Sequence, residues 1–238
     1  MFETYQLGLP LVQPAQAQKH VTVNEAIARL DALAQLRVVA ADLTTPPVTA
    51  LDGESYLVGA GAGETWQGRD RQVAIFSNGG WVFATPKMGW RAWDEARATT
   101  LTFDGTAWIE NAIAVSVSGA ATRNRVVELT HTLSAGASSV TTAVIPSHAS
   151  VVGVTARVLT AISGAGVGSW SLGVPGAVDR YGSGLGLAAG SFALGISGTP
   201  VTYYAPTELQ ITADAGSFDG GVLSLAVHCT ELLPPRAA

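Results

Sequence analysis

Alternating apolar and polar side chains run through the C-terminal half of the chain and limit what it can fold into. The alternating segments are rich in β-branched residues and are separated by Gly, Pro and Ser: ELTHTL, SSVTTAVI, SVVGVTARVL, TYYAPTELQITA and GGVLSLAVHCTEL. A period of two places successive side chains on opposite faces of a strand. In the last segment one face carries Leu223, Leu225, Val227 and Cys229, and the other carries Ser224, Ala226, His228 and Thr230. The pattern predicts about five to eight strands in an antiparallel β-sandwich of the jelly-roll kind.

The composition allows a sizeable core and argues against a polyanionic partner. The chain has 238 residues, 47% of them hydrophobic, and its length suits one large domain or a few small ones. Only 13% of the residues are charged and the formal net charge is -5, so we expect no nucleic-acid partner. The most apolar region, SVVGVTARVLTAISGAGVGSW, is interrupted by Arg157 and several glycines, so we expect no membrane insertion.

Residues that would indicate secretion, a disulfide or a metal site are missing from the sequence. The N-terminal stretch MFETYQLGLPLVQPAQAQKH has no basic leader and no unbroken apolar run, so we expect synthesis in the cytoplasm and release on lysis. Cys229 is the single cysteine, which excludes an internal disulfide. The four histidines are widely separated and have no metal-binding spacing. We therefore expect neither a metal nor a cofactor.

Differences in local composition divide the chain into three segments. Residues 1–43 carry a helical pattern, residues 44–111 carry most of the tryptophans, and residues 112–238 carry the alternating pattern. The Pro-containing stretch at 44–47 and the small-residue run AIAVSVSGAATR mark the boundaries. The expected fold is mainly β: a short N-terminal helix, a small aromatic-rich β-meander and the C-terminal sandwich.

The segment QAQKHVTVNEAIARLDALAQL, residues 16–36, predicts the one helix. Thr22 and Glu25 have the spacing of a capping box, which places the helix start near Val23. Apolar residues then follow at helical spacing: Val23, Ile27, Leu30 and Ala34, widened by Ala26, Leu33 and Leu36. This stripe either packs on the domain that follows or brings copies of the chain together around a shared axis. For the second case the oligomerisation residues are Val23, Ile27, Leu30, Leu33 and Ala34.

The middle segment predicts hairpins and leaves two roles open for its tryptophans. Asn78-Gly79 and Asp104-Gly105 each lie between short apolar runs and favour tight turns with positive φ. Trp81, Trp90, Trp93 and Trp108 recur in similar short contexts. Their rings can fill a small core or stack on the apolar face of a sugar.

Three blocks together resemble a known domain family. These are QAQKHVTVNEAIARLDALAQL, then GESYLVGAGAGETWQGRDRQVAIFSNGGWVFATPKMGWRAWDE, then LTFDGTAWIE, and they span about residues 9–110. They resemble an uncharacterised domain family of tail, fibre and spike proteins in alphaproteobacterial prophages and virus-like gene transfer agents. The resemblance implies a virion-surface component, with other virion proteins as partners, and carries no catalytic motif. Fibres of this general kind are often trimers and a spike on a capsid vertex would follow fivefold symmetry, so the resemblance implies a homo-oligomer, either a trimer or a pentamer.

One glycine-rich stretch of the C-terminal segment is a candidate glycan site. GVPGAVDRYGSGLGLAAGS gathers Asp179, Arg180 and Tyr181, and Trp170 lies just before it. Planar polar groups beside an aromatic ring suit sugar hydroxyls, and binding residues are concentrated on loops. The alternatives are that Asp179 and Arg180 only pair with each other or with another copy, and that Trp170 fills the core.

The resemblance, together with the candidate glycan site, favours a non-enzymatic spike or fibre protein that binds a cell-surface polysaccharide of the recipient bacterium. Its helix would form a homo-oligomer, and its C-terminal sandwich would be the receptor-binding head. The closest pair of acids in the C-terminal segment, Asp214 and Asp219, is explained by turn chemistry rather than glycoside hydrolysis. Two alternatives remain: a structural connector that binds another particle protein, and a capsule-degrading enzyme.

Overall fold

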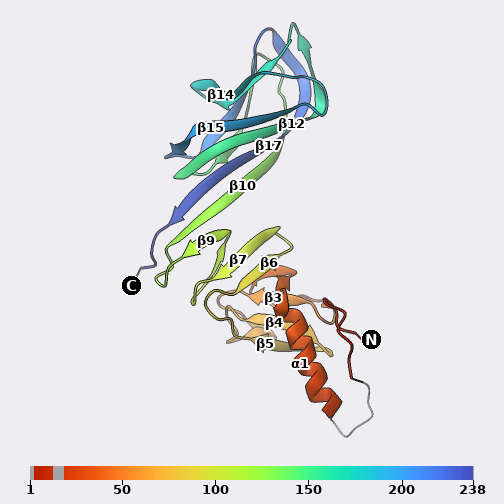
Figure 1. The fold of residues 1–238 in the computed structure, drawn as a ribbon. Coiled ribbons are helices and arrows are strands. Elements are labelled where there is room, and N and C mark those ends of the chain that lie inside the picture. The colour runs from red at the N-terminus through yellow and green to blue at the C-terminus, as the bar shows by residue number, and fades with distance from the viewer. Residues whose placement is uncertain (1–2, 13–18, 238) are drawn as a thin grey trace. The chain divides into compact units, whose positions relative to one another are not determined.

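The chain is mainly β-structure and consists of two compact units. The computed structural model describes residues 3–12 and 19–237. Unit 1 comprises residues 1–121 and 234–238, and unit 2 comprises residues 122–233. Unit 2 is therefore an insertion between two stretches of unit 1 (Figure 1). The helix and the tryptophan-rich segment, which the sequence pattern separates at residue 43, belong to the same unit.

Helix α1 (Lys19–Ala34) belongs to unit 1 and begins earlier than predicted. Thr22 lies inside the helix, so the predicted start near Val23 is wrong. No Gly or Pro separates Lys19 from Thr22, and nothing in that stretch opposes helix formation. Residues 16–18 of the predicted helical segment lie outside the described residues.

Two small sheets form the body of unit 1. The first has the order β1 (Arg37–Val38), β6 (Arg91–Asp94), β7 (Thr99–Phe103), β8 (Trp108–Glu110). The second has the order β2 (Ala40–Leu43), β3 (Ser55–Val58), β4 (Val73–Ser77), β5 (Gly80–Ala84). A 3-10 turn, η1 (Glu64–Trp66), follows β3, and β9 (Ala112–Val115) follows β8. Within each sheet one pair, β1 with β6 or β2 with β3, is parallel and the other pairs are antiparallel.

The predicted hairpins of unit 1 are present. Strands β4 and β5 meet at Asn78 and Gly79, which both have positive φ. Gly105 has a φ of +100° in the turn between β7 and β8. These are backbone conformations that Asn and Gly adopt at low cost, which explains why the turn residues were informative.

Unit 2 is an eight-stranded jelly roll. In chain order its strands are β10 (Ala121–Thr132), β11 (Ser138–Ile145), β12 (Ala149–Ala165), β13 (Trp170–Val174), β14 (Ala177–Leu185), β15 (Phe192–Tyr203), β16 (Thr207–Ala213) and β17 (Ser217–Leu233). They form sheets of order β15-β12-β17-β10 and β11-β16-β13-β14. If the strands are numbered one to eight, these orders are 6-3-8-1 and 2-7-4-5, as in a double Greek key. The prediction of a mainly β fold with an antiparallel C-terminal sandwich is confirmed.

Both sheets of unit 2 contribute to a single apolar core. The face of β17 that the alternation predicted to be buried is buried: Leu223, Leu225, Val227 and Cys229. Residues of the other sheet, such as Leu172, Leu209 and Ile211, belong to the same cluster. Burial of apolar surface in this continuous core stabilises unit 2 by about 25 cal/mol per Å².

Candidate functional site

The four residues predicted to bind a glycan do not share one surface. Trp170 is 1% exposed and Tyr181 is 2% exposed, and both belong to the core of unit 2. The indole N–H of Trp170 donates to the Gly186 carbonyl over 3.0 Å. The phenols of Tyr181 and Tyr203 are 2.8 Å apart, and burial raises the pKa of Tyr181 far above its ordinary value. Neither ring is available to stack on a ligand, so the alternative of core filling holds for Trp170.

Asp179 and Arg180 are exposed, but on a strand rather than in a loop. Both lie on β14 (Ala177–Leu185), and they form no ion pair with each other. The glycines around them, which suggested a loop, allow close strand packing: a Cβ on Gly173 would lie 2.1 Å from the Ala177 carbonyl oxygen. A Cβ on Gly195 would lie 2.2 Å from the Tyr181 carbonyl oxygen. A ligand role for Asp179 and Arg180 stays a prediction.

The predicted apolar stripe of α1 is not the face that the helix buries. Asp31 and Ala32 are buried, whereas Val23 is 43% exposed and Leu30 is 59% exposed. Ile27 and Leu33 are half-buried and Ala34 is exposed. Within unit 1 the buried contacts of the helix come from Asp31 and Ala32, and the half-buried Leu33 packs against the core beside them. Val23 and Leu30 are the large side chains of the stripe that remain exposed.

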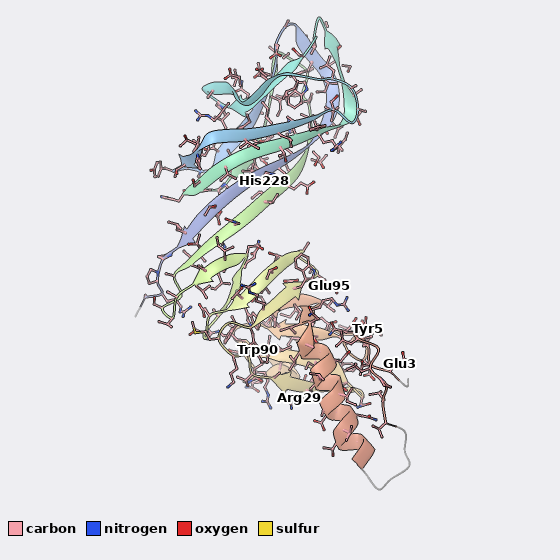
Figure 2. All side chains as sticks on the ribbon, in the orientation of Figure 1. Glu3, Tyr5, Arg29, Trp90, Glu95 and His228 are labelled. Carbon is pink, nitrogen blue, oxygen red and sulfur yellow. The ribbon has the colours of Figure 1, made fainter. Side chains whose placement is uncertain are left out.

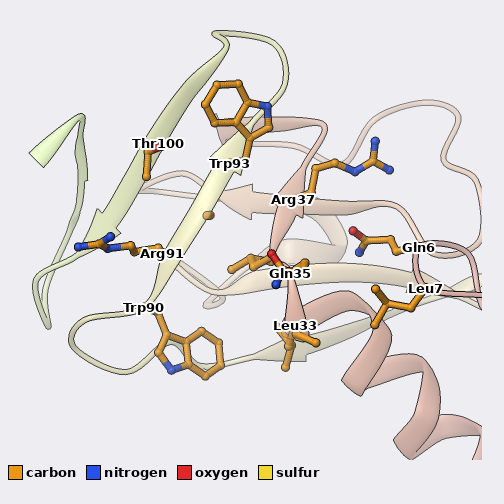
Figure 3. A pocket seen from close by; sticks show the side chains of 12 residues that line it. Gln6, Leu7, Leu33, Gln35, Arg37, Trp90, Arg91, Trp93 and Thr100 are labelled. Atoms are coloured by element: carbon orange, nitrogen blue, oxygen red, sulfur yellow. The ribbon is translucent and has the colours of Figure 1, made fainter. Parts of the chain in front are cut away.

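A pocket of about 660 Å³ lies in unit 1 where the end of α1, β1 and β6 meet (Figure 3). We call it the Trp90/Trp93 pocket. Its lining consists of Gln6, Leu7, Leu33, Ala34, Gln35, Leu36, Arg37, Trp90, Arg91, Ala92, Trp93 and Thr100. Its volume is within the range of about 300–1,000 Å³ that small-ligand sites have.

Strand pairing explains how Trp93 reaches the pocket. Side chains of β6 alternate, so that Ala92 and Asp94 are buried whereas Arg91 and Trp93 are exposed. Trp93 is paired with Arg37 on β1 and with Thr100 on β7. This register places a cation, an indole ring and a hydroxyl side by side on the outer face of the sheet. The Trp93 side chain is 45% exposed.

Trp90 forms a second aromatic wall of the pocket. Its half-buried ring packs with Leu33 against the core of unit 1. In Figure 3 the two indole rings lie on different sides of the opening, with the Gln35 amide between them. Within the described residues the indole N–H groups of Trp90 and Trp93 have no hydrogen-bond acceptor, and the Gln35 amide has no partner. The pocket therefore combines apolar surface with polar groups that are free to bind a ligand.

The positive groups of the pocket differ in their partners. Arg37 forms an ion pair with Glu95, and its guanidinium lies 5.9 Å from the centre of the Tyr5 ring. Arg91 has no ion-pair or hydrogen-bond partner among the described residues. The lining contains no Asp or Glu. One positive charge is therefore left without compensation at this site.

An N-terminal arm, residues 3–12, forms one rim of the pocket. The buried carboxylate of Asp31 on α1 accepts hydrogen bonds from the Thr4 hydroxyl at 2.7 Å and from the backbone N–H groups of Gln6 at 2.9 Å and Leu7 at 2.7 Å. Glu3 and Tyr5 consequently lie beside the helix (Figure 2). A second pocket, of about 570 Å³, lies beneath the arm and includes Tyr5 and Phe76.

The polar and aromatic groups of the Trp90/Trp93 pocket are two indole rings, two amides, two guanidinium groups and one hydroxyl. No pair of carboxylates lines the Trp90/Trp93 pocket, and no nucleophile lies beside a base there. Among the described residues there is no group of three or more His, Cys, Asp or Glu side chains able to hold a metal ion. Within the same residues, no helix has the length and apolar character needed to cross a membrane.

The other tryptophans of unit 1 mainly fill its core. Trp66 is fully buried and meets Trp81 edge to face at a centroid distance of 5.0 Å. Sequence reasoning did not separate these from Trp90 and Trp93. A signal was present in the stretch GWRAWDE, whose period of two puts Arg91 and Trp93 on the face opposite Ala92 and Asp94. This alternation alone does not show which of the two faces is covered by other elements and which is left exposed.

Comparisons with known proteins agree with an uncharacterised domain in the N-terminal part. A comparison with curated proteins finds no match. Among solved structures, the "Cyanophage Pam1 capsid asymmetric unit" is similar with 22% sequence identity and a TM-score of 0.38, covering 48% of this chain and 86% of that chain. That similarity is too weak to support an argument about this chain. Residues 23–109 match the family described as "Protein of unknown function (DUF2793)". The chain is thus similar to this family over a range that includes every residue of the Trp90/Trp93 pocket except Gln6 and Leu7.

Proposed function

We propose that this protein is a surface component of a phage-like particle and binds a polysaccharide of the recipient bacterial cell. The resemblance of residues 9–110 to a domain of prophage and gene-transfer-agent fibres and spikes supports the proposal that the protein belongs to a phage-like particle. The match to an uncharacterised family is consistent with this proposal. The jelly roll of unit 2 is an architecture common in capsid and lectin domains.

The Trp90/Trp93 pocket is the observation that carries the carbohydrate part of the proposal. Indole rings bury the apolar C–H face of a sugar, and amide and guanidinium groups hydrogen-bond its hydroxyls. Trp90 and Trp93 supply the rings, while Gln35 and Arg91 supply polar groups that have no partner within the described residues. The proposed site therefore lies in unit 1, since Trp170 and Tyr181 of the site predicted in the C-terminal segment are buried.

Self-association through α1 would make weak glycan sites effective. Copies joined along Val23, Ile27 and Leu30 would carry several pockets, and multivalent binding exceeds single-site affinity by roughly 10²–10⁴. The uncovered apolar side chains of the helix support this part of the proposal.

The test is binding of labelled protein to encapsulated bacterial cells and to matched cells without capsule. We expect capsule-dependent binding, which Trp93→Ala should reduce at least tenfold. Tyr204→Ala is the matched control, because this exposed aromatic residue of unit 2 lies outside the pocket. Equal binding to both kinds of cell, or full binding by Trp93→Ala, would contradict the proposal. Incubation with capsule should leave its viscosity unchanged, because we propose binding without cleavage.

A second candidate function is a structural connector that binds another particle protein. Strand β15, at the edge of its sheet, exposes an apolar row made of Phe192 (60%), Leu194 (67%) and Ile196 (80%). Rows of this kind mark protein interfaces. Replacement of all three by Ser should abolish capture of a purified particle protein if the connector role is correct, and should leave glycan binding intact if it is not.

A further inference from the structure

We propose that the ligand of the Trp90/Trp93 pocket is an acidic saccharide whose carboxylate is bound by Arg91. This inference rests on the proposed function and adds the chemical class of the sugar and the residue that selects it.

The charge of the pocket differs from the charge of the chain. The whole chain has a formal net charge of -5, yet the pocket is lined by two arginines and no carboxylate. The carboxylate of Glu95 forms an ion pair with Arg37, so the charge of the Arg37 guanidinium is already neutralised. Arg91 has no such partner in the part of the chain that the structure describes. An anionic group on the ligand would complement this single charge.

The position of Arg91 fits a sugar acid bound against the indole rings. Arg91 and Trp93 project from the same face of β6 because they are two residues apart. Figure 3 shows Arg91 between the levels of Trp90 and Trp93, on the side away from Arg37. A pyranose that lies against one of these rings presents its ring substituents at its edge. A planar guanidinium there can hold a carboxylate substituent through two parallel hydrogen bonds.

The same chemistry disfavours a nucleic acid. Indole rings also stack on bases, but single-stranded nucleic acids are bound along a track of several cations. The pocket offers one unpaired guanidinium and lies on an acidic chain. The observations therefore favour a sugar with an isolated negative charge.

The experiment measures calorimetric binding of the full chain to oligomers of galacturonic, glucuronic and mannuronic acid, each compared with its methyl ester. The acid form of the preferred oligomer should bind roughly tenfold or more tightly than its ester, as expected for a charge-assisted hydrogen bond. Arg91→Gln should abolish this difference, and Arg91→Lys should retain part of it, because Lys keeps the charge but not the planar fork. Increased salt should weaken only the binding of the acid.

Arg29→Gln provides the matched control. Arg29 on α1 is also exposed and has no side-chain partner among the described residues, but it lies outside the pocket, so its loss should leave both affinities unchanged. Equal affinity for acid and ester, or an acid preference that survives in Arg91→Gln, would overturn the assignment while the carbohydrate function stands. Failure of every acid and ester to bind would overturn both the role of Arg91 and the proposed carbohydrate binding. Stronger binding of an oligothymidylate than of any acid would also overturn it, in favour of a nucleic acid.

Discussion

The six tryptophans show how differently one residue type is used in this molecule. Trp170 is almost completely buried in unit 2 and donates a hydrogen bond to Gly186, whereas Trp93 is 45% exposed at a pocket. Trp170→Ala should lower the free energy of unfolding of unit 2 by about 3–5 kcal/mol, because it leaves a cavity that the jelly roll cannot close. Trp93→Ala should cost less than about 1 kcal/mol, since its ring loses little buried surface. Chemical denaturation followed by circular dichroism measures both. Comparable losses for the two variants would show that Trp93 is a core residue.

The N-terminal arm depends on one side chain of α1. Asp31→Ala removes the acceptor of three hydrogen bonds and should destabilise the arm by about 2–3 kcal/mol, since hydrogen bonds to charged groups are the stronger kind. Limited proteolysis should then cleave near residues 3–9, while the sheets stay folded. Glu25→Ala, an exposed change on the same helix, should leave the cleavage rate unchanged. An arm that stays protected in Asp31→Ala would show that its apolar contacts suffice.

The C-terminal tail is held within unit 1 by an ion pair between an exposed arginine and a buried carboxylate. Arg236 pairs with Asp104, and its backbone N–H donates to the Ser118 carbonyl over 2.9 Å. Burial alone would raise the pKa of Asp104, but hydrogen bonds from Ala107, Arg236 and Thr106 outweigh it and lower the pKa below its ordinary value. A lowered folded-state pKa adds stability above the unfolded-state value, and this stability is lost as the pH falls through the folded-state value.

Arg236→Ala should therefore raise the pKa of Asp104 and free the tail. The measurement is an NMR titration of the Asp104 carboxyl together with acid unfolding of the variant. Its unfolding midpoint should move to higher pH, because less of the stabilising charge interaction remains. Arg180→Ala serves as the control for a lost positive charge elsewhere. An unchanged Asp104 titration would show that backbone donors alone hold the carboxylate.

At the scale of the whole molecule, the uncovered stripe of α1 predicts a homo-oligomer. Val23→Asp with Leu30→Asp should convert a trimer or pentamer into a monomer, because charges at these positions oppose burial of the helix. Light scattering measures the mass. Val21→Asp is the matched control: this exposed residue lies on a different face of the helix at about 100° per residue. A monomeric unmodified protein, or an oligomer that survives both aspartates, would contradict the prediction.

The sequence by itself determined the class of structure. The period of two along residues 220–232 correctly predicted which face of β17 is buried, because strand geometry leaves only two faces to choose from. Asn78-Gly79 marked a hairpin, because positive φ favours these residues locally. Both inferences depend on neighbours within a few residues.

Only the tertiary structure decided which side chains are left for a ligand. The stripe of α1 was predicted either to pack on the following domain or to join copies of the chain. Within unit 1, Asp31 and Ala32 are buried and Leu33 packs beside them, because the partners of the helix come from distant strands. Tyr181 looked like a loop residue and proved to be core, because glycines allow β13, β14 and β15 to approach closely. The Trp90/Trp93 pocket joins residues 6–7, 33–37, 90–93 and 100. Such a site arises from strand register and from the covering of one sheet face, and neither is encoded in local periodicity.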